Sequence, residues 1–229
     1  MRKGTLFRKA VRVRIDASVS FPPGWTTAQL QRILLRNRFE GVIAHGEPFE
    51  DAPEWILGWI GPPGAPDHPR LAAIVSGLED AAETVRRNLA AEIAEHDLTA
   101  IAEFATTHPD ARIVVPRTGG AGFGPTPDKK WLAGLAALAR TPNVFLKIDG
   151  FLSAPPPHGP WIQAALEHFG PQRCIYGSGW PLYTTPGTWK EALACFTQSI
   201  GARSIEFREH VLGGTAWEAY GVSTLTSRK

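Results

Sequence analysis

Cysteines, long apolar runs and blocks of one charge sign are scarce or absent in this chain of 229 residues. There are two cysteines, Cys174 in an apolar segment and Cys195 in a helical one. We expect two buried free thiols, which fits a reducing compartment. No stretch of about 18 or more apolar residues is present to span a membrane, and no apolar run near the N-terminus precedes a small-residue cleavage site. The expectation is a soluble, cytoplasmic protein without a membrane partner.

The charge balance is close to neutral. The chain has 24 lysines and arginines and 22 aspartates and glutamates, so its formal net charge is +2. Basic residues gather only near the N-terminus, at Arg2, Lys3, Arg8, Lys9, Arg12 and Arg14. A solvated entry segment explains this cluster better than a surface that follows a phosphate backbone. We therefore expect no nucleic acid partner.

What the chain does contain is typical of a globular protein with a sizeable core. Hydrophobic residues make up 43% and charged residues 20% of the sequence. No composition shift or long linker divides the chain. We predict one domain over residues 1–229, with flexible ends at 1–9 and 223–229. The oligomeric state stays open, a homo-oligomer included.

Strand and helix patterns alternate along the chain. Alternating or short apolar runs predict strands over residues 11–20, 41–44, 71–75, 111–115, 143–148 and 174–176. Apolar spacings of three and four, with capping residues, predict helices over residues 26–38, 51–59, 97–104, 128–138, 161–169, 189–200 and 216–220. Residues 81–96 fit a helix, but 90–95 fit a buried strand equally well. This alternation indicates a parallel α/β fold, either an open sheet or a closed barrel.

Four segments, in chain order, carry a resemblance to a known family. They are Ile15-Asp-Ala-Ser-Val-Ser20, Leu138-Ala-Arg-Thr-Pro-Asn-Val-Phe-Leu-Lys-Ile-Asp-Gly-Phe151, Phe169-Gly-Pro-Gln-Arg-Cys-Ile-Tyr-Gly-Ser-Gly-Trp-Pro181, and Ala216 with Tyr220-Gly221. They resemble motifs of the amidohydrolase-related (amidohydrolase 2) family, which contains metal-dependent hydrolases, lactonases and decarboxylases. The resemblance implies a TIM-like (β/α) barrel with its site at the carboxyl ends of the strands.

The same segments depart from that family at the positions that hold its metal. Ser18 and Ser20 stand where relatives have two histidines, and Gly179 stands where they have an aspartate. Arg117 aligns with a further histidine position, and a guanidinium offers only hydrogen-bond donors. Hydroxyl groups are poor ligands beside imidazole or carboxylate. We therefore expect a divergent member with no metal cofactor.

The chain is also short for this family. The shortfall is expected between Asp80 and Asp110, where relatives fit two strands and this chain has room for one. The sequence thus predicts a shortened or distorted barrel of seven or eight strands.

Polar residues near the predicted strand ends supply the candidate site. The candidates are Asp16 and Asp149 for catalysis, and Ser18, Ser20, His45, Arg117, Lys147, Ser178 and Trp180 for ligand binding. Each also has a structural alternative: Asp16 can hold backbone at the barrel mouth, and Lys147 can pair with Asp149, since alternate strand residues share a face. A displaced metal site built from His45, Glu47 and His96 is a further alternative.

One loop has the composition of an anion-binding segment. Residues 119–124 are glycine-rich and follow Arg117, so backbone groups beside a positive charge could hold an anion. No Gly-Lys-Ser/Thr follows, which argues against a phosphate loop. Gly177-Ser-Gly179 lacks the spacing of a nucleophile elbow, so an activated-serine hydrolase is unsupported.

Three functions remain open. The first is a metal-free barrel that binds a small, anionic molecule at its mouth through Arg117 and Lys147. The second is an active hydrolase or lactonase, either metal-free with Asp16 or Asp149 as general base, or with a displaced metal. The third is an interaction role that uses the eight tryptophans and the proline-rich loops.

Overall fold

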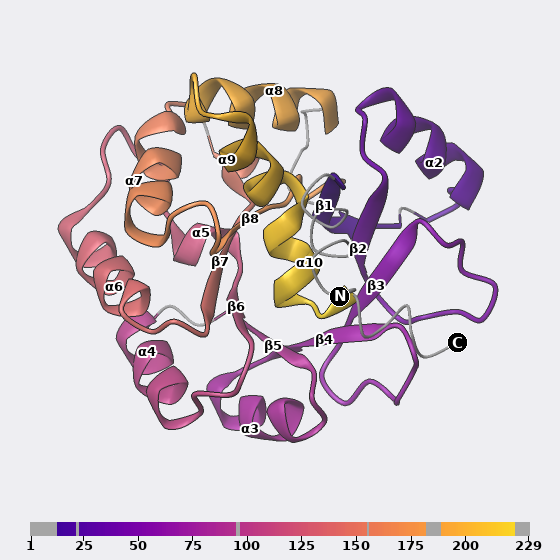
Figure 1. Ribbon diagram of the computed structural model, residues 1–229, viewed down its shortest axis with the longest axis horizontal. Coiled ribbons are helices and arrows are strands. Elements are labelled where there is room, and N and C mark those ends of the chain that lie inside the picture. Colours follow the sequence, from indigo (N-terminus) through magenta and orange to yellow (C-terminus); the bar gives the residue numbers. More distant parts are fainter. Residues whose placement is uncertain (1–12, 22, 95–96, 155, 182–188, 223–229) are drawn as a thin grey trace, which may run out of the picture.

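The computed structural model describes residues 13–21, 23–94, 97–154, 156–181 and 189–222. Eight parallel strands form one sheet in the order of the chain, and the sheet curls into a barrel (Figure 1). The strands are β1 (Ile15–Ser20), β2 (Gly41–His45), β3 (Ile56–Gly61), β4 (Leu71–Ser76), β5 (Ala90–Ile93), β6 (Ile113–Val115), β7 (Val144–Ile148) and β8 (Cys174–Tyr176). This confirms the TIM-like barrel and gives it eight strands.

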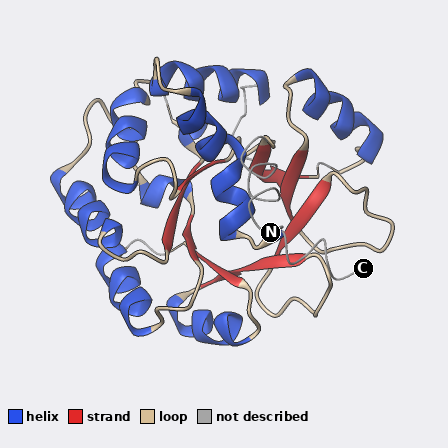
Figure 2. Ribbon diagram, viewed as in Figure 1, coloured by secondary structure: helices blue, strands red, loops and turns tan. Residues whose placement is uncertain are grey.

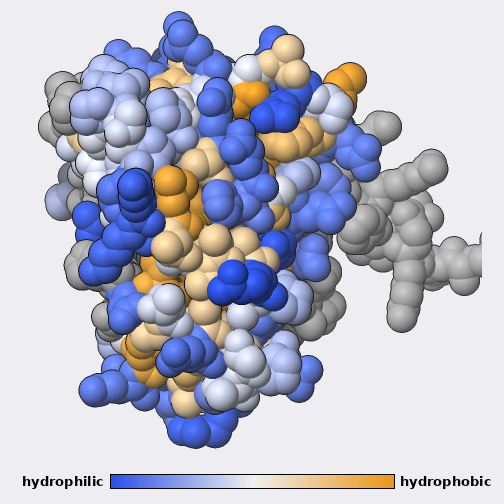
Figure 3. All heavy atoms as spheres, turned by 90° about the vertical axis from the view of Figure 1, so that its left-hand side faces the viewer, coloured by the Kyte–Doolittle hydropathy of each residue, from blue (hydrophilic) through white to orange (hydrophobic). Residues whose placement is uncertain are grey.

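Helices surround most of the barrel, as Figure 2 shows. They are α2 (Thr27–Arg36), α3 (Leu78–Arg86), α4 (Leu98–Thr107), α5 (Arg117–Gly120), α6 (Lys129–Ala139), α7 (Gly159–Phe169), α8 (Trp189–Ile200), α9 (Ile205–Glu209) and α10 (Thr215–Ala219), with a 3₁₀ turn at Phe151–Ser153 and a π-helical turn at His210–Gly214. On the face of the molecule drawn in Figure 3, hydrophilic residues surround smaller patches of hydrophobic residues. Within the described residues, none of these helices is both long and apolar enough to cross a bilayer.

Side-chain caps account for several helix starts that the sequence predicted. Thr26 and Gln29 form a capping box at α2, and the Asp97 carboxylate accepts from the backbone of Thr99 and Ala100 at α4. Asp128 caps α6 by accepting from the N–H of Trp131 at 2.7 Å. These contacts satisfy backbone donors that a helix leaves unpaired.

The helix predicted over residues 51–59 is wrong, because the chain forms strand β3 there. Asp51 and Pro53 resemble a helix start, yet the apolar run that follows is short and bounded by Gly61 and two prolines. Such a run fits a buried strand or a buried helix equally by periodicity alone. Pairing with β2 and β4 on both sides decides for the strand.

No strand of the barrel is missing; instead, two connections between strands are short. Residues 46–55 join β2 to β3, and residues 62–70 join β3 to β4, without a helix in either connection. The sequence left both a helix and a buried strand open for residues 81–96. The structure has the end of helix α3 there, followed by strand β5. One strand, β5, lies between Asp80 and Asp110 as predicted, but the shortfall expected there is wrong, because helices α3 and α4 flank that strand and the ring keeps eight strands.

The lower part of the barrel is apolar and is filled by the C-terminal helix. Each strand contributes at least one buried residue to a cluster that also holds α10; the members include Ile15, Ile43, Ile60, Ala73, Ala90, Val114, Phe145, Ile175, Ala216 and Ala219. Figure 1 shows α10 within the ring of strands. Because residues two apart share a strand face, His45, Glu92 and Lys147 form the next layer toward the barrel mouth.

The barrel closes between β8 and β1 with very little backbone pairing. One parallel bridge joins Val19 to Trp180, and the N–H of Ser20 donates to the Trp180 carbonyl at 2.9 Å. A side chain supplements this seam: Asp16 Oδ1 accepts from the N–H of Ser18 at 3.2 Å and of Ser178 at 2.9 Å. The Asp16 carboxylate therefore bridges the two strands where a ladder would otherwise stand.

Candidate functional site

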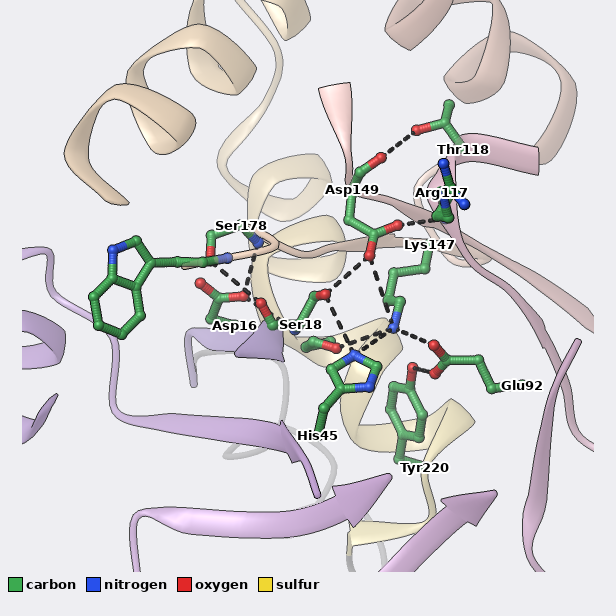
Figure 4. A network of polar contacts seen from close by, with 12 residues as sticks. Asp16, Ser18, His45, Glu92, Arg117, Thr118, Lys147, Asp149, Ser178 and Tyr220 are labelled. Atoms are coloured by element: carbon green, nitrogen blue, oxygen red, sulfur yellow. Dashed lines mark hydrogen bonds and ion pairs between the residues drawn. The ribbon is translucent and has the colours of Figure 1, made fainter. Parts of the chain in front are cut away.

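A buried ammonium group occupies the barrel interior directly above the apolar layer. Lys147 is 0% exposed. Its Nζ donates to Glu92 Oε1 at 2.7 Å and lies 3.9 Å from Asp149 Oδ2 (Figure 4). It also lies 3.4 Å from His45 Nε2 and 3.4 Å from the Ala17 carbonyl oxygen. Residues in or directly after β1, β2, β5 and β7 thus direct hydrogen-bond acceptors at one cation.

The far side of this cluster is anchored by the C-terminal segment. Tyr220 follows α10 and donates its hydroxyl proton to Glu92 Oε2 at 3.0 Å. Both Glu92 oxygens are therefore engaged, one by the ammonium and one by the phenol. Burial, with the neighbouring Glu92 charge, raises the pKa of Tyr220 well above its ordinary value, so the phenol stays a proton donor.

Asp149 connects the ammonium to the barrel mouth. Its Oδ2 accepts from the Ser18 hydroxyl at 2.9 Å, and its Oδ1 accepts from the backbone N–H of Arg117 at 2.5 Å. The Thr118 hydroxyl donates to the Asp149 carbonyl at 3.0 Å. Burial raises the pKa of Asp149, and the Lys147 charge opposes that rise.

Glycine is required beside this carboxylate. A Cβ added to Gly177 would lie 2.7 Å from Ser18 Cβ and 3.1 Å from Asp149 Cβ. Gly177 thereby lets β1 and β7 side chains meet next to β8. The segment Gly177-Ser-Gly179 thus allows close packing at the seam and does not form a nucleophile elbow.

The pKa values of His45 and Asp16 are shifted in opposite directions from their ordinary values. Burial, and then the Lys147 charge, lower the pKa of His45 to about 3, so its imidazole is neutral and Nε2 faces the ammonium. Burial raises the pKa of Asp16 to about 7, although two backbone N–H groups favour its ionised form. Within the described residues, Asp16 Oδ2 has no hydrogen-bond partner.

The predicted site residues fall into distinct places. Ser18, His45, Lys147 and Asp149 meet in the interior network, where Lys147 and Asp149 pair as the structural alternative proposed. Asp16, Ser178 and Trp180 lie at the seam, where the Trp180 N–H donates to Ser178 Oγ at 3.1 Å. Ser20 is half-buried, and Arg117 and Glu47 are exposed. His96 lies outside the described residues.

Sequence reasoning missed Glu92 and Tyr220. Glu92 is a carboxylate within the apolar strand Ala90–Ile93, and that position alone could have marked it as a buried charge in need of a partner. Tyr220 carries no comparable signal, because only the packing of α10 inside the barrel brings its hydroxyl to Glu92.

A small pocket lies at the rim of the barrel beside β6 and β7. Its volume is about 90 Å³, and Arg117, Phe123, Gly150 and Ser153 are among its lining residues. Arg117 begins a turn, labelled α5, in which Arg117 and Thr118 have left-handed backbone angles, with φ of 54° and 52°. The contacts of this turn with Asp149 hold that uncommon conformation in place.

Solved structures with a similar fold include one with bound zinc. An amidohydrolase from Burkholderia multivorans with bound zinc aligns with a TM-score of 0.76 at 18% identity, covering 91% of this chain and 99% of that chain. Amidohydrolase 2 from Bifidobacterium longum subsp. infantis aligns with a TM-score of 0.73 at 18% identity, covering 91% and 98%. At these identities the likeness shows the fold.

The described residues around Lys147 do not fit a divalent cation. Within the described residues, no group of three or more His, Cys, Asp or Glu side chains is arranged to hold a metal ion. Ser18 donates its proton to Asp149, Gly179 has no side chain, and the Lys147 ammonium already stands among the nearest acceptors. A second cation beside that ammonium would meet charge repulsion.

Curated relatives match part of the chain. L-fucono-1,5-lactonase from Burkholderia ambifaria is 28% identical over 140 residues, which cover 55% of this chain and 47% of that protein. The enzyme of the same name from Burkholderia multivorans is 28% identical over 109 residues, covering 41% of this chain and 36% of that protein. The chain therefore spans about half the length, or less, of the curated relatives that it matches.

A family model described as Amidohydrolase matches residues 42–222, which run from β2 to the segment after α10. That match covers seven of the eight strands and includes His45, Glu92, Lys147 and Asp149, but not β1 with Ser18. The matched segment, the order of the eight strands and the structural neighbours agree. This chain belongs to the amidohydrolase family.

Proposed function

We propose that this protein is a metal-independent member of the amidohydrolase family that binds a small anionic molecule at the barrel rim. The observation that carries this proposal is the pocket of about 90 Å³ that Arg117 lines together with Gly120 and Ser153. A guanidinium with hydrogen-bonding neighbours suits a carboxylate group. The pocket lies at the carboxyl ends of the strands, where barrels of this kind bind their ligands.

Lys147 has a different role from the one that the sequence suggested. Its ammonium is fully buried beneath the mouth and is engaged with Glu92 and Asp149. It therefore contributes to the electrostatics of the barrel interior and does not reach a ligand in the rim pocket. Arg117 remains the cationic residue of the proposed binding site.

Binding of simple carboxylates tests the proposal. Titration calorimetry with malonate and acetate is expected to show saturable binding, whereas neutral malonamide is expected to bind far more weakly. Replacing Arg117 with Gln removes a charge-assisted hydrogen bond, so affinity is expected to fall about tenfold or more. Arg140→Gln, an exposed arginine after α6 at the opposite end of the barrel, is the matched control.

The outcome can contradict the proposal in two ways. Equal loss of affinity in the Arg117 and Arg140 variants would indicate a nonspecific charge effect. The absence of malonate and acetate binding at millimolar concentrations would remove the rim pocket as an anion site. Because Arg117 is exposed, added salt is expected to weaken the binding.

Hydrolysis of a lactone is the second candidate function, favoured by the names of the two curated relatives. Asp149 supports it, since a buried carboxylate whose pKa is raised is a stronger base than an ordinary aspartate. In that reaction Asp149 would take a proton from water as the water oxygen bonds to the lactone carbonyl carbon. The bond from that carbon to the ring oxygen would then break, and the ring oxygen would receive the proton from Asp149 to give the hydroxy acid.

A pH-indicator assay with L-fucono-1,5-lactone separates the two candidates. Turnover above background that Asp149→Asn abolishes would support hydrolysis. Asp110→Asn, outside the network, serves as the matched control. No turnover in the wild type, together with malonate binding, would leave the binding function as the better account.

A further inference from the structure

The rim pocket has polar side chains near solvent and apolar groups among its buried residues. Arg117 and Ser153 line it and are exposed, whereas Pro116 and Phe123 line it and are buried. Ala121, which is half-buried, adds a methyl group to the same lining. A ligand in this pocket therefore meets a positive charge at its outer end and hydrocarbon at its inner end.

The charge of the lining suits one carboxylate. The Ser153 hydroxyl donates its proton to the Gly150 carbonyl at 2.6 Å, so this proton is not offered to a ligand. Among the described residues that line the pocket, no second lysine or arginine stands beside Arg117. One guanidinium matches one carboxylate, whereas a second carboxylate would lose hydration against apolar groups.

The size of the pocket limits the rest of the ligand. Its volume is about 90 Å³, and a water molecule in the liquid occupies about 30 Å³. The pocket therefore holds a few non-hydrogen atoms, which is enough for a carboxylate with a short apolar group.

The backbone around the pocket has an uncommon conformation. Among the described residues, the non-glycine residues with positive φ are Arg38, Asn88, Arg117, Thr118 and Phe123. Arg38 and Asn88 directly follow the C-caps of α2 and α3, where this conformation is common. The other three lie within residues 117–123, and two of them line the pocket. Strained backbone of this kind gathers at ligand sites, where surrounding contacts hold it.

Aromatic contacts hold Phe123 in its place in the lining. Its ring centroid lies 5.9 Å from that of His158 and 5.8 Å from that of Trp161. The Trp161 indole N–H donates to the carbonyl of Gly124, the next residue, at 2.7 Å. The phenyl group is thus positioned before a ligand binds, which lowers the cost of ordering the site.

We propose that the rim pocket selects small monocarboxylates that carry a short apolar group, and that Phe123 determines this preference. Arg117 binds the carboxylate, while Pro116, Ala121 and Phe123 contact the apolar group. The inference rests on the anion site proposed above and adds the class of ligand that this site takes.

Titration calorimetry of the wild-type protein with four carboxylates tests the preference. Propionate and glycolate have the same number of non-hydrogen atoms, but one ends in a methyl group and the other in a hydroxyl group. Propionate is expected to bind about fourfold more tightly than acetate, because one more carbon is buried. It is also expected to bind more tightly than glycolate and malonate.

Two variants test the role of the lining. Phe123→Asn removes the phenyl group and keeps a residue type that tolerates positive φ, so propionate and glycolate should then bind about equally. Ala121→Ser changes the lining with little change in volume and should lower the ratio of propionate to glycolate affinity. Phe49→Asn, at an exposed phenylalanine outside this lining, is the matched control and should keep the wild-type ratio.

The outcomes separate this inference from the proposed function. Equal affinities of the wild type for acetate, propionate and glycolate, or tighter binding of malonate than of propionate, would overturn the inference and leave the anion site in place. So would an unchanged ratio in a folded Phe123→Asn protein or, if that variant does not fold, in Ala121→Ser. Absence of binding by all four carboxylates would remove the anion site itself.

Discussion

Lys147 is the residue on which the interior of the barrel depends. A buried charge is costly unless it is paired, and the carboxylate of Glu92 lies 2.7 Å from the ammonium. Replacing Lys147 with Met is expected to lower the free energy of unfolding by about 3–5 kcal/mol, because two carboxylates then lose their cation. Chemical denaturation monitored by tryptophan fluorescence measures this loss.

The matched double variant shows whether the loss comes from the unpaired charge. Lys147→Met combined with Glu92→Gln removes both partners, and its stability is expected to lie well above that of Lys147→Met alone. Strictly additive losses in the two single variants and the double variant would show that the two side chains do not interact.

Asp16 and His45 make opposite contributions to the pH dependence of stability. The pKa of Asp16 is raised to about 7, so the folded state binds the Asp16 proton more tightly than the unfolded state. The stability that this adds is lost as pH rises from about 4 to 7. The pKa of His45 is lowered to about 3, so its contribution is lost as pH falls below about 6.5. The two effects offset each other in wild type.

Single variants should separate these effects. In Asp16→Asn the melting temperature is expected to rise from pH 4 to about pH 6.5, since His45 then dominates. In His45→Gln it is expected to fall over the range from about pH 4 to pH 7. Melting curves over this range decide the matter, and parallel profiles for the two variants would refute the assignment.

At the scale of elements, the π-helical turn His210–Gly214 fits closely against the start of β1. A Cβ on Gly213 would lie 1.6 Å from the Val13 carbonyl oxygen, so backbone would have to move. Gly213→Ala is therefore expected to destabilise the fold by about 3 kcal/mol or more. Gly122→Ala is the control, because its added Cβ would meet only Trp161 at 3.9 Å.

Thermal unfolding of these two alanine variants measures the prediction. Similar melting temperatures for both would mean that the π-helical turn can shift away from β1 at little cost. The contrast matters for the site, since this turn leads into α10 and places Tyr220 beside Glu92.

The elements that sequence patterns predicted best are those with strong local signals. Thr26, Asp97 and Asp128 mark helix starts through capping contacts that involve only neighbouring residues. Strand β3 was missed because a short apolar run carries no distinguishing period. The nonlocal pairing of that run with β2 and β4, which sequence does not display, makes it a strand.

For the molecule as a whole, motif resemblance predicted the barrel and the position of the site at its carboxyl end. Ser18, His45, Lys147 and Asp149 could be chosen because they stand near strand ends, and the fold brings them together. Glu92 could not be chosen from the strand-end rule, and Tyr220 needs α10 inside the barrel. Local sequence determines the strands, whereas closure of the barrel determines which charges meet.

Loss of helices, with all eight strands kept, explains how so short a chain forms a barrel. Eight strands preserve the ring of carboxyl ends that a site requires, while loops replace helices around β3. The third sequence hypothesis, an interaction surface rich in tryptophan, gains little from this arrangement. Among the described residues, Trp25 is the only exposed tryptophan, with 39% of its surface accessible.

Metal analysis of the wild-type protein tests the central claim most directly. The protein is expressed in medium supplemented with zinc and manganese, purified without chelator, and analysed by inductively coupled plasma mass spectrometry. With the Lys147 ammonium as the internal cation, only trace amounts of either metal should remain bound. Near-stoichiometric zinc or manganese, removed by chelator with a fall in melting temperature, would contradict the account.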